Sequence, residues 1–125
     1  MSKILIVDDE EPLRLLVSRA LQMDGHETMT AEDGGAALDI VTAENGAFDL
    51  VLTDIKMPVM DGIALALSIA AKFPDLRILL MTGYADQRER AHGLDALIHD
   101  VVTKPFSVAD IRAAVKDALD APKNR

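Results

Sequence analysis

The chain alternates short apolar runs with longer segments in which apolar residues recur at every third or fourth position. Short uninterrupted apolar runs are typical of strands buried on both faces, and the longer spacing is typical of amphipathic helices. The predicted strands cover residues 4–7, 27–31, 48–53, 78–81 and 101–103, and the second has the weakest pattern. The predicted helices run from Pro12 to Gly25, over residues 36–43, from Asp61 to Lys72, over residues 85–97 and from Ser107 to Pro122.

Two of these helices begin with residues that suit a helix N-terminus. Asp61 can cap the third helix, and Ser107 with Asp110 resembles a capping box for the last one. The helix over residues 85–97 is ambiguous, because Gly93 interrupts a polar stretch.

Five strand–helix units follow one another from end to end of the chain. This order favours one α/β domain over residues 1–125, a doubly wound parallel sheet with helices on both faces. Ligands of such sheets bind beyond the carboxyl ends of the strands. The functional residues are therefore expected at these ends.

Four of the apolar runs stop at charged or hydroxyl side chains. Asp8 and Asp9 follow the first run, Asp54 the third, Thr82 the fourth and Lys104 the last. A charge is costly at the end of a buried strand unless another group pairs with it. If the strands are parallel neighbours, these groups converge at one edge of the sheet. Such a set can hold a divalent cation and transfer a phosphoryl group to an aspartate.

The composition narrows the function classes. A net charge of −8 argues against nucleic-acid binding, which needs a basic face. The absence of cysteine excludes disulfides, thiolate metal sites and cysteine nucleophiles. Because no apolar stretch is long enough for a signal peptide or a membrane span, we expect a soluble, cytoplasmic protein.

Taken together, four short motifs resemble the receiver domain of two-component response regulators, also called CheY-like domains. They are residues 7–10 (VDDE), 52–62 (LTDIKMPVMDG), 81–83 (MTG) and 103–106 (TKPF). The resemblance covers residues 3 to about 120, and it is specific because all four motifs occur in order at strand ends. It implies a flavodoxin-like sheet with the strand order 2-1-3-4-5. It also implies a bacterial phosphoprotein that acts in phosphorelay signal transduction.

The resemblance implies a role for each residue at the acidic end of the sheet. Asp54 would accept a phosphoryl group from a histidine kinase or a histidine phosphotransfer protein. Asp9, Asp54 and the backbone carbonyl of Lys56 would bind Mg²⁺, and Asp8 would assist through water. A hard cation with oxygen ligands also relieves the repulsion among clustered carboxylates.

The remaining roles concern the bound phosphoryl group. Thr82, the N–H of Gly83 and Lys104 would contact its oxygens, and Lys56 would lie beside it. Pro105 after Lys104 suggests a cis peptide bond, as in the family.

One position departs from the family pattern and suggests a narrower relationship. Val101 stands where many receivers have an aromatic ring that turns inward on activation, so Tyr84 is the nearest candidate to report the movement of Thr82. In these features the chain resembles CpdR-like stand-alone receivers. That resemblance implies control of regulated proteolysis or the cell cycle, through a protease or its adaptor as the downstream protein target.

Simpler interpretations exist for each residue on its own. Asp8 and Asp9 could cap the first helix, Thr82 could be an ordinary N-cap, and Lys104 could be a solvated charge. Two rival functions also exist: an aspartyl-phosphate hydrolase and a pseudo-receiver that binds without phosphorylation. The chain lacks the Asp-x-Asp pattern of such hydrolases after its first strand, and it has no residues left for their inserted cap. The intact set of motifs argues against a pseudo-receiver. We therefore expect a signalling module that is not an enzyme.

Overall fold

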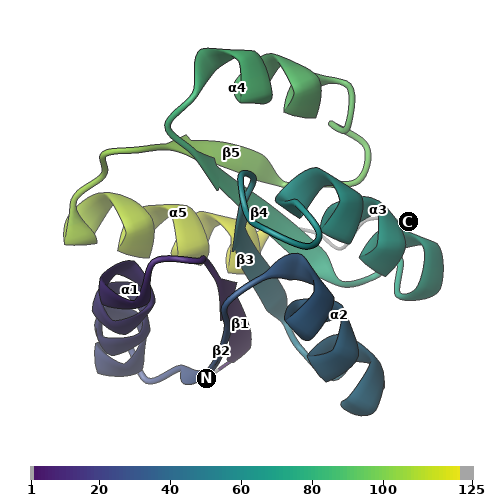
Figure 1. Ribbon diagram of the computed structural model, residues 1–125. Coiled ribbons are helices and arrows are strands. Elements are labelled where there is room, and N and C mark those ends of the chain that lie inside the picture. The colour runs from purple at the N-terminus through teal and green to yellow at the C-terminus, as the bar shows by residue number, and fades with distance from the viewer. Residues whose placement is uncertain (1, 122–125) are drawn as a thin grey trace.

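The computed structural model describes residues 2–121, apart from the side chains of Ala85, Asp86, Gln87 and His92. Strands and helices alternate along this part of the chain (Figure 1). Their bounds are β1 Lys3–Val7, α1 Glu11–Met23, β2 Glu27–Ala31, α2 Gly34–Ala43, β3 Leu50–Asp54, α3 Gly62–Lys72, β4 Arg77–Thr82, α4 Ala85–His92, β5 Asp100–Thr103 and α5 Val108–Asp120.

The five strands form one parallel sheet in the order β2-β1-β3-β4-β5. Helices α1 and α5 pack on one face, and α2, α3 and α4 lie on the other (Figure 1). The predicted α/β class and the strand order implied by the family resemblance are both confirmed. The central strands are covered by helices on both faces, which accounts for their uninterrupted apolar sequences.

Alternate residues of the strands separate into two hydrophobic cores. On β1, Ile4 and Ile6 face the core beneath α1 and α5, whereas Leu5 and Val7 face the core beneath α2 and α3. All four side chains are fully buried. This two-residue period fixes the strands against slipping by one position, because a slip would exchange the two faces.

The capping signals of the sequence are confirmed. The Asp61 carboxylate accepts a hydrogen bond from the backbone N–H of Ala64 at 2.8 Å. Ser107 and Asp110 form a reciprocal capping box at the start of α5. A cap that the sequence analysis missed, Asp33, lets α2 begin at Gly34, two residues before the predicted start.

The predicted helix over residues 85–97 was wrong in its second half. Helix α4 ends at His92, and Gly93 follows as its C-cap residue. Leu94 and Leu97 instead pack on the core from a turn, in which the Leu97 N–H donates to the Leu94 carbonyl at 2.7 Å. Burial of these two leucines outweighs the weak helical preference of a segment interrupted by glycine. The predicted end of the last helix at Pro122 lies outside the described residues.

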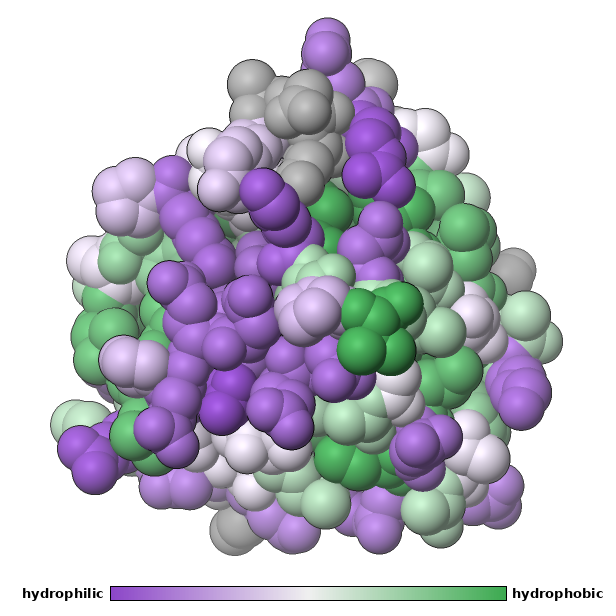
Figure 2. Space-filling model, in the orientation of Figure 1, coloured by the Kyte–Doolittle hydropathy of each residue, from purple (hydrophilic) through white to green (hydrophobic). Residues whose placement is uncertain are grey.

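Strand β3 begins at Leu50, two residues later than predicted, and includes Asp54 as its last residue. In the described part of the chain, no helix is both long and apolar enough to cross a membrane. The face of the molecule seen in Figure 1 carries a broad hydrophilic area that hydrophobic residues border (Figure 2).

Candidate functional site

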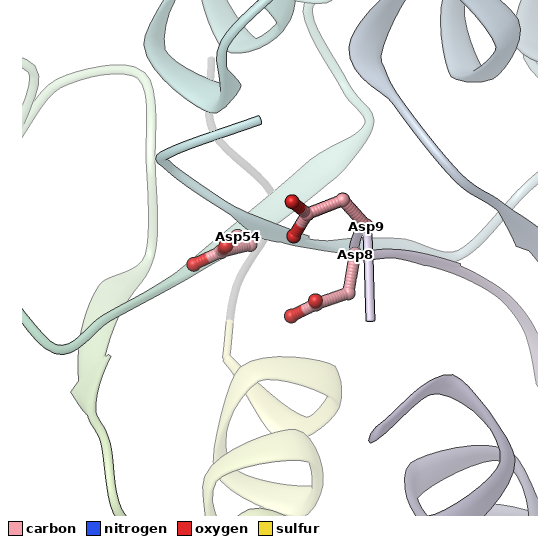
Figure 3. Close-up of side chains that lie close together, drawn as sticks. All are labelled: Asp8, Asp9 and Asp54. Atoms are coloured by element: carbon pink, nitrogen blue, oxygen red, sulfur yellow. The ribbon is translucent and has the colours of Figure 1, made fainter. Parts of the chain in front are cut away.

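The register of the sheet brings the candidate residues to one edge. Val7 lies opposite Thr53, so Asp8 and Asp9 after β1 lie beside Asp54 at the end of β3. Each of these three carboxylates offers an oxygen within 4.8 Å of the others. Figure 3 shows the three side chains gathered at this point. The convergence predicted from the strand ends is therefore present.

Asp8 is fully buried, and hydrogen bonds hold both of its carboxylate oxygens. Oδ1 accepts from the backbone N–H of Glu10 at 2.9 Å, and Oδ2 accepts from Nζ of Lys104 at 2.9 Å. The guanidinium of Arg14 donates to the backbone carbonyl of Asp8. A buried carboxylate with this many donors has a fixed orientation, which makes Asp8 a rigid wall of the site.

Asp54 is only 7% exposed, and its Oδ1 lies 3.3 Å from Nζ of Lys104. The pKa of Asp54 is raised to about 6. Burial raises this pKa most, the positive charge of Lys104 lowers it in part, and the negative charge of Asp8 raises it. The site therefore holds more carboxylate charge than the Lys104 ammonium balances. A cation placed among these oxygens would favour the ionised, nucleophilic form.

Lys104 connects the two buried acids. Its Nζ lies 2.9 Å from Asp8, 3.3 Å from Asp54 and 4.0 Å from Glu10. Burial lowers the pKa of Lys104, but the hydrogen bond to Asp8 and the charges of Asp54 and Asp8 outweigh it, so the pKa is raised. The lysine therefore stays protonated. The expected cis peptide bond between Lys104 and Pro105 is present.

The donor set fits Mg²⁺. Asp8, Asp9 and Asp54 supply hard carboxylate oxygens, and the exposed position of Asp9 leaves room for the water ligands that Mg²⁺ retains. Lys56 lines the same cavity as Asp9 and Asp54, and its role as a carbonyl ligand stays a prediction.

Thr82 and Gly83 lie at the end of β4, beside the acids. Thr82 is buried, and its Oγ1 accepts a hydrogen bond from the backbone N–H of Tyr84 at 3.1 Å. The acidic side chains open into a cavity of about 480 Å³, lined by Asp9, Glu10, Asp54, Lys56, Gly83, Tyr84 and Lys104. This volume accommodates a phosphoryl group and its water molecules.

Two contacts near the site were not predicted from the sequence. Nζ of Lys56 lies 4.9 Å from the centre of the Tyr84 ring, at the mouth of the cavity. Arg88 of α4 donates to the Val101 carbonyl at 3.3 Å and to Oγ1 of Thr103 at 2.6 Å. Neither contact can be predicted from a local sequence pattern, because each joins two segments that become neighbours only when the sheet forms.

A family model of the response regulator receiver domain matches residues 4–116 of the chain. The chain belongs to this family. Receiver domains accept a phosphoryl group from histidine kinases or histidine phosphotransfer proteins in two-component phosphorelays.

Among curated receivers, Sporulation initiation phosphotransferase F of Bacillus subtilis (strain 168) is 40% identical over 124 residues. The aligned part covers 98% of this chain and 97% of that protein. The probable transcriptional regulator ycf27 of Cyanophora paradoxa is 36% identical over 122 residues, which is 98% of this chain and 50% of ycf27. The chain thus spans nearly all of the first relative and about half of the second.

Solved receiver structures agree with this fold. The response regulator protein TrrA from Thermotoga maritima, in complex with Mg²⁺-BeF, has 36% identity and a TM-score of 0.83. The match covers 94% of this chain and 99% of that one. The chemotaxis response regulator CheY4 of Vibrio cholerae has 28% identity and a TM-score of 0.82, over 94% of this chain and 98% of CheY4.

Proposed function

We propose that this receiver domain accepts a phosphoryl group on Asp54 from a histidine kinase or a histidine phosphotransfer protein. The observation that carries the proposal is the position of Asp54, buried at the end of β3 with the Lys104 ammonium 3.3 Å away and two further acids beside it. The cavity in front of this carboxylate admits a phosphoryl group.

In the transfer step, an oxygen of the ionised Asp54 carboxylate forms a bond to phosphorus while the bond from phosphorus to the donor imidazole nitrogen breaks. The electron pair returns to that nitrogen. Lys104 balances the negative charge on a phosphoryl oxygen, and the Gly83 N–H and the Thr82 hydroxyl hold the others. Asp9, Asp54 and Asp8 would hold Mg²⁺, which when bound neutralises charge on the transferred group.

The output would begin at Thr82. Its hydroxyl now accepts from the Tyr84 N–H, so a turn toward the phosphoryl group would break this bond and shift the start of α4. Arg88 would carry the shift to β5 through Val101 and Thr103. We expect Tyr84→Ala to accept phosphate and lose binding of a downstream protein.

The domain would assist its own phosphorylation and dephosphorylation without acting on an external substrate. Its similarity to phosphotransferase F along nearly the whole of both chains favours onward transfer of the phosphoryl group to another protein. Its CpdR-like features favour control of a protease or its adaptor. A hydrolase of the aspartyl-phosphate kind is disfavoured because such an enzyme has an inserted cap. Within residues 2–121, every helix and strand belongs to the single sheet or to the two helical layers that cover it.

The experiment is phosphorylation with acetyl phosphate and Mg²⁺, followed by intact-mass analysis. We expect one added phosphoryl group on the wild type and none on Asp54→Asn. Asp49→Asn, which lies just before the opposite end of β3, is the matched control and should be labelled normally. Equal labelling of Asp54→Asn would refute the proposal.

A further inference from the structure

Val59 has a backbone conformation that its side chain disfavours. Its φ is +70°, in the left-handed region, where a β-branched residue costs free energy. Among the described residues other than glycine, Asn45 also has positive φ, at +58°. Asparagine tolerates this region, because its short polar side chain bonds locally. The valine side chain makes no such bond, and the turn around it is closed by the backbone, where the Met60 N–H donates to the Pro58 carbonyl at 2.8 Å.

Packing does not compensate Val59 either. The residue is 85% exposed, so the isopropyl group gains little from burial within the chain. Glycine at this position would adopt the same φ without steric cost. The fold alone thus gives no reason for valine here.

The surrounding structure prevents the loop from relaxing. The Gly34 N–H donates to the Met60 carbonyl, the Gly62 N–H donates to the Ile55 carbonyl, and Asp61 caps α3. A Cβ on Gly34 would lie 2.3 Å from the Met60 oxygen, so the start of α2 and this loop are in tight contact. Strain of this kind persists only where neighbouring groups fix the backbone, and it gathers at functional positions.

The loop lies at the mouth of the acid site. It follows Asp54 directly, and its Lys56 lines the phosphoryl cavity. A protein that presents a phosphohistidine to Asp54 must cover this rim. An apolar group that is already held in place there loses little conformational entropy when a partner binds, and this favours affinity.

We propose that Val59 is a contact residue for the histidine-phosphorylated donor and helps to determine which donor is accepted. The strained loop presents its isopropyl group to an apolar surface beside the donor histidine. This inference rests on the proposed phosphoryl-acceptor function and deepens it.

The test uses donors of known chemistry: purified, autophosphorylated histidine kinases and histidine phosphotransfer proteins from the same genome. The donor with the highest kcat/KM on the wild type is then used with Val59→Gly, Val59→Ile and Met23→Ala. Met23 is 80% exposed at the far end of α1 and serves as the matched control.

We expect Val59→Gly to raise the KM for the donor tenfold or more, with kcat within about twofold, because a contact residue affects association and not chemistry. Its urea midpoint should rise as the strain is removed. Val59→Ile and Met23→Ala should transfer within twofold of wild type. All variants should react with acetyl phosphate at the wild-type rate.

A wild-type KM for Val59→Gly would overturn the inference, and so would an unchanged or lower urea midpoint. If acetyl phosphate labels Asp54 but no donor transfers to the wild type, the donor contact is refuted and the acceptor function stands. If acetyl phosphate also fails, the acceptor function itself is refuted.

Discussion

The acid site and the α4–β5 region differ in how firmly they are held. At the site, Asp8 is fully buried, both of its oxygens are bonded, and Asp54 and Thr82 are nearly inaccessible. In α4, by contrast, only Ala91 is buried among the side chains that the structure describes. The chemistry thus lies where positions are fixed, and the expected response lies where few contacts must break.

Arg88 connects the two elements of the α4–β5 region through exposed hydrogen bonds. Its guanidinium joins α4 to the exposed edge of β5 by hydrogen bonds to Val101 and Thr103. Exposed hydrogen bonds contribute modestly to stability, so we expect a small change at Thr82 to shift them.

Lys104→Met should strongly slow phosphoryl transfer to Asp54 at the acid site. The variant removes the ammonium that balances Asp8 and Asp54, and we expect phosphorylation by acetyl phosphate to slow by roughly 10²-fold. Lys116→Met, which breaks only the surface pair with Asp120, should react normally. Comparable rates for the two variants would mean that Lys104 takes no part in the transfer.

The pH dependence of stability should change when Asp54 is neutralised. The pKa of Asp54 is raised from 3.8 to about 6, chiefly by burial. The contribution of Asp54 to the free energy of unfolding is therefore most favourable below pH 3.8, where the carboxyl is protonated, and is lost as the pH rises through 6. Without metal, Asp54→Asn should therefore be more stable than wild type by on the order of 2 kcal/mol at pH 8, and nearly equal to it at pH 4. Urea unfolding of both proteins in the presence of a chelator, at pH 4 and pH 8, measures this difference in stability. A difference that is the same at both pH values would contradict the prediction.

Mg²⁺ affinity should depend more on Asp9 than on Asp8. Asp8 already bonds to Lys104 and to the Glu10 N–H, whereas Asp9 is exposed at the mouth of the site. We expect Asp9→Asn to weaken binding about tenfold or more and Asp8→Asn to weaken it less. Isothermal titration decides the order, and unchanged affinity in both variants would rule out the site.

Tyr84 supplies a direct optical report on the movable region. It is the only tyrosine in a chain without tryptophan, so tyrosine emission reports this residue alone. Mg²⁺ with beryllofluoride should change that emission in the wild type and in Val101→Ala, since Val101 has no ring to turn. Thr82→Ala lacks the hydroxyl that bonds the Tyr84 N–H and should show no change. Loss of the response in Val101→Ala would show that the Val101 side chain is itself needed to pass the movement of Thr82 to Tyr84.

Lys56→Ala should shorten the lifetime of the acyl phosphate by about threefold, because Lys56 and Tyr84 partly cover the cavity mouth and their interaction is modest. Decay of the labelled protein after removal of acetyl phosphate measures this lifetime. An equal or longer lifetime would refute the covering role.

The sequence predicted the fixed region better than the movable one. Buried strands have strong apolar patterns, and parallel strands must end at a common edge, so the meeting of Asp8, Asp9, Asp54, Thr82 and Lys104 follows from the pattern. The end of α4 at His92 was missed because long-range packing of Leu94 and Leu97 decided it. The contacts of Arg88 and the φ of Val59 depend on the folded backbone, which no short-range pattern encodes.

Hydrogen exchange of the wild-type protein with and without Mg²⁺ and beryllofluoride tests the central division most directly. The TrrA complex with Mg²⁺-BeF shows that a receiver of this fold can be prepared in that form. We expect exchange to change most in residues 83–103, whereas β1 and the first residues of β3 keep their protection. An unchanged segment 83–103, or equal changes in β1 and β3, would contradict a fixed site coupled to a movable α4–β5 region.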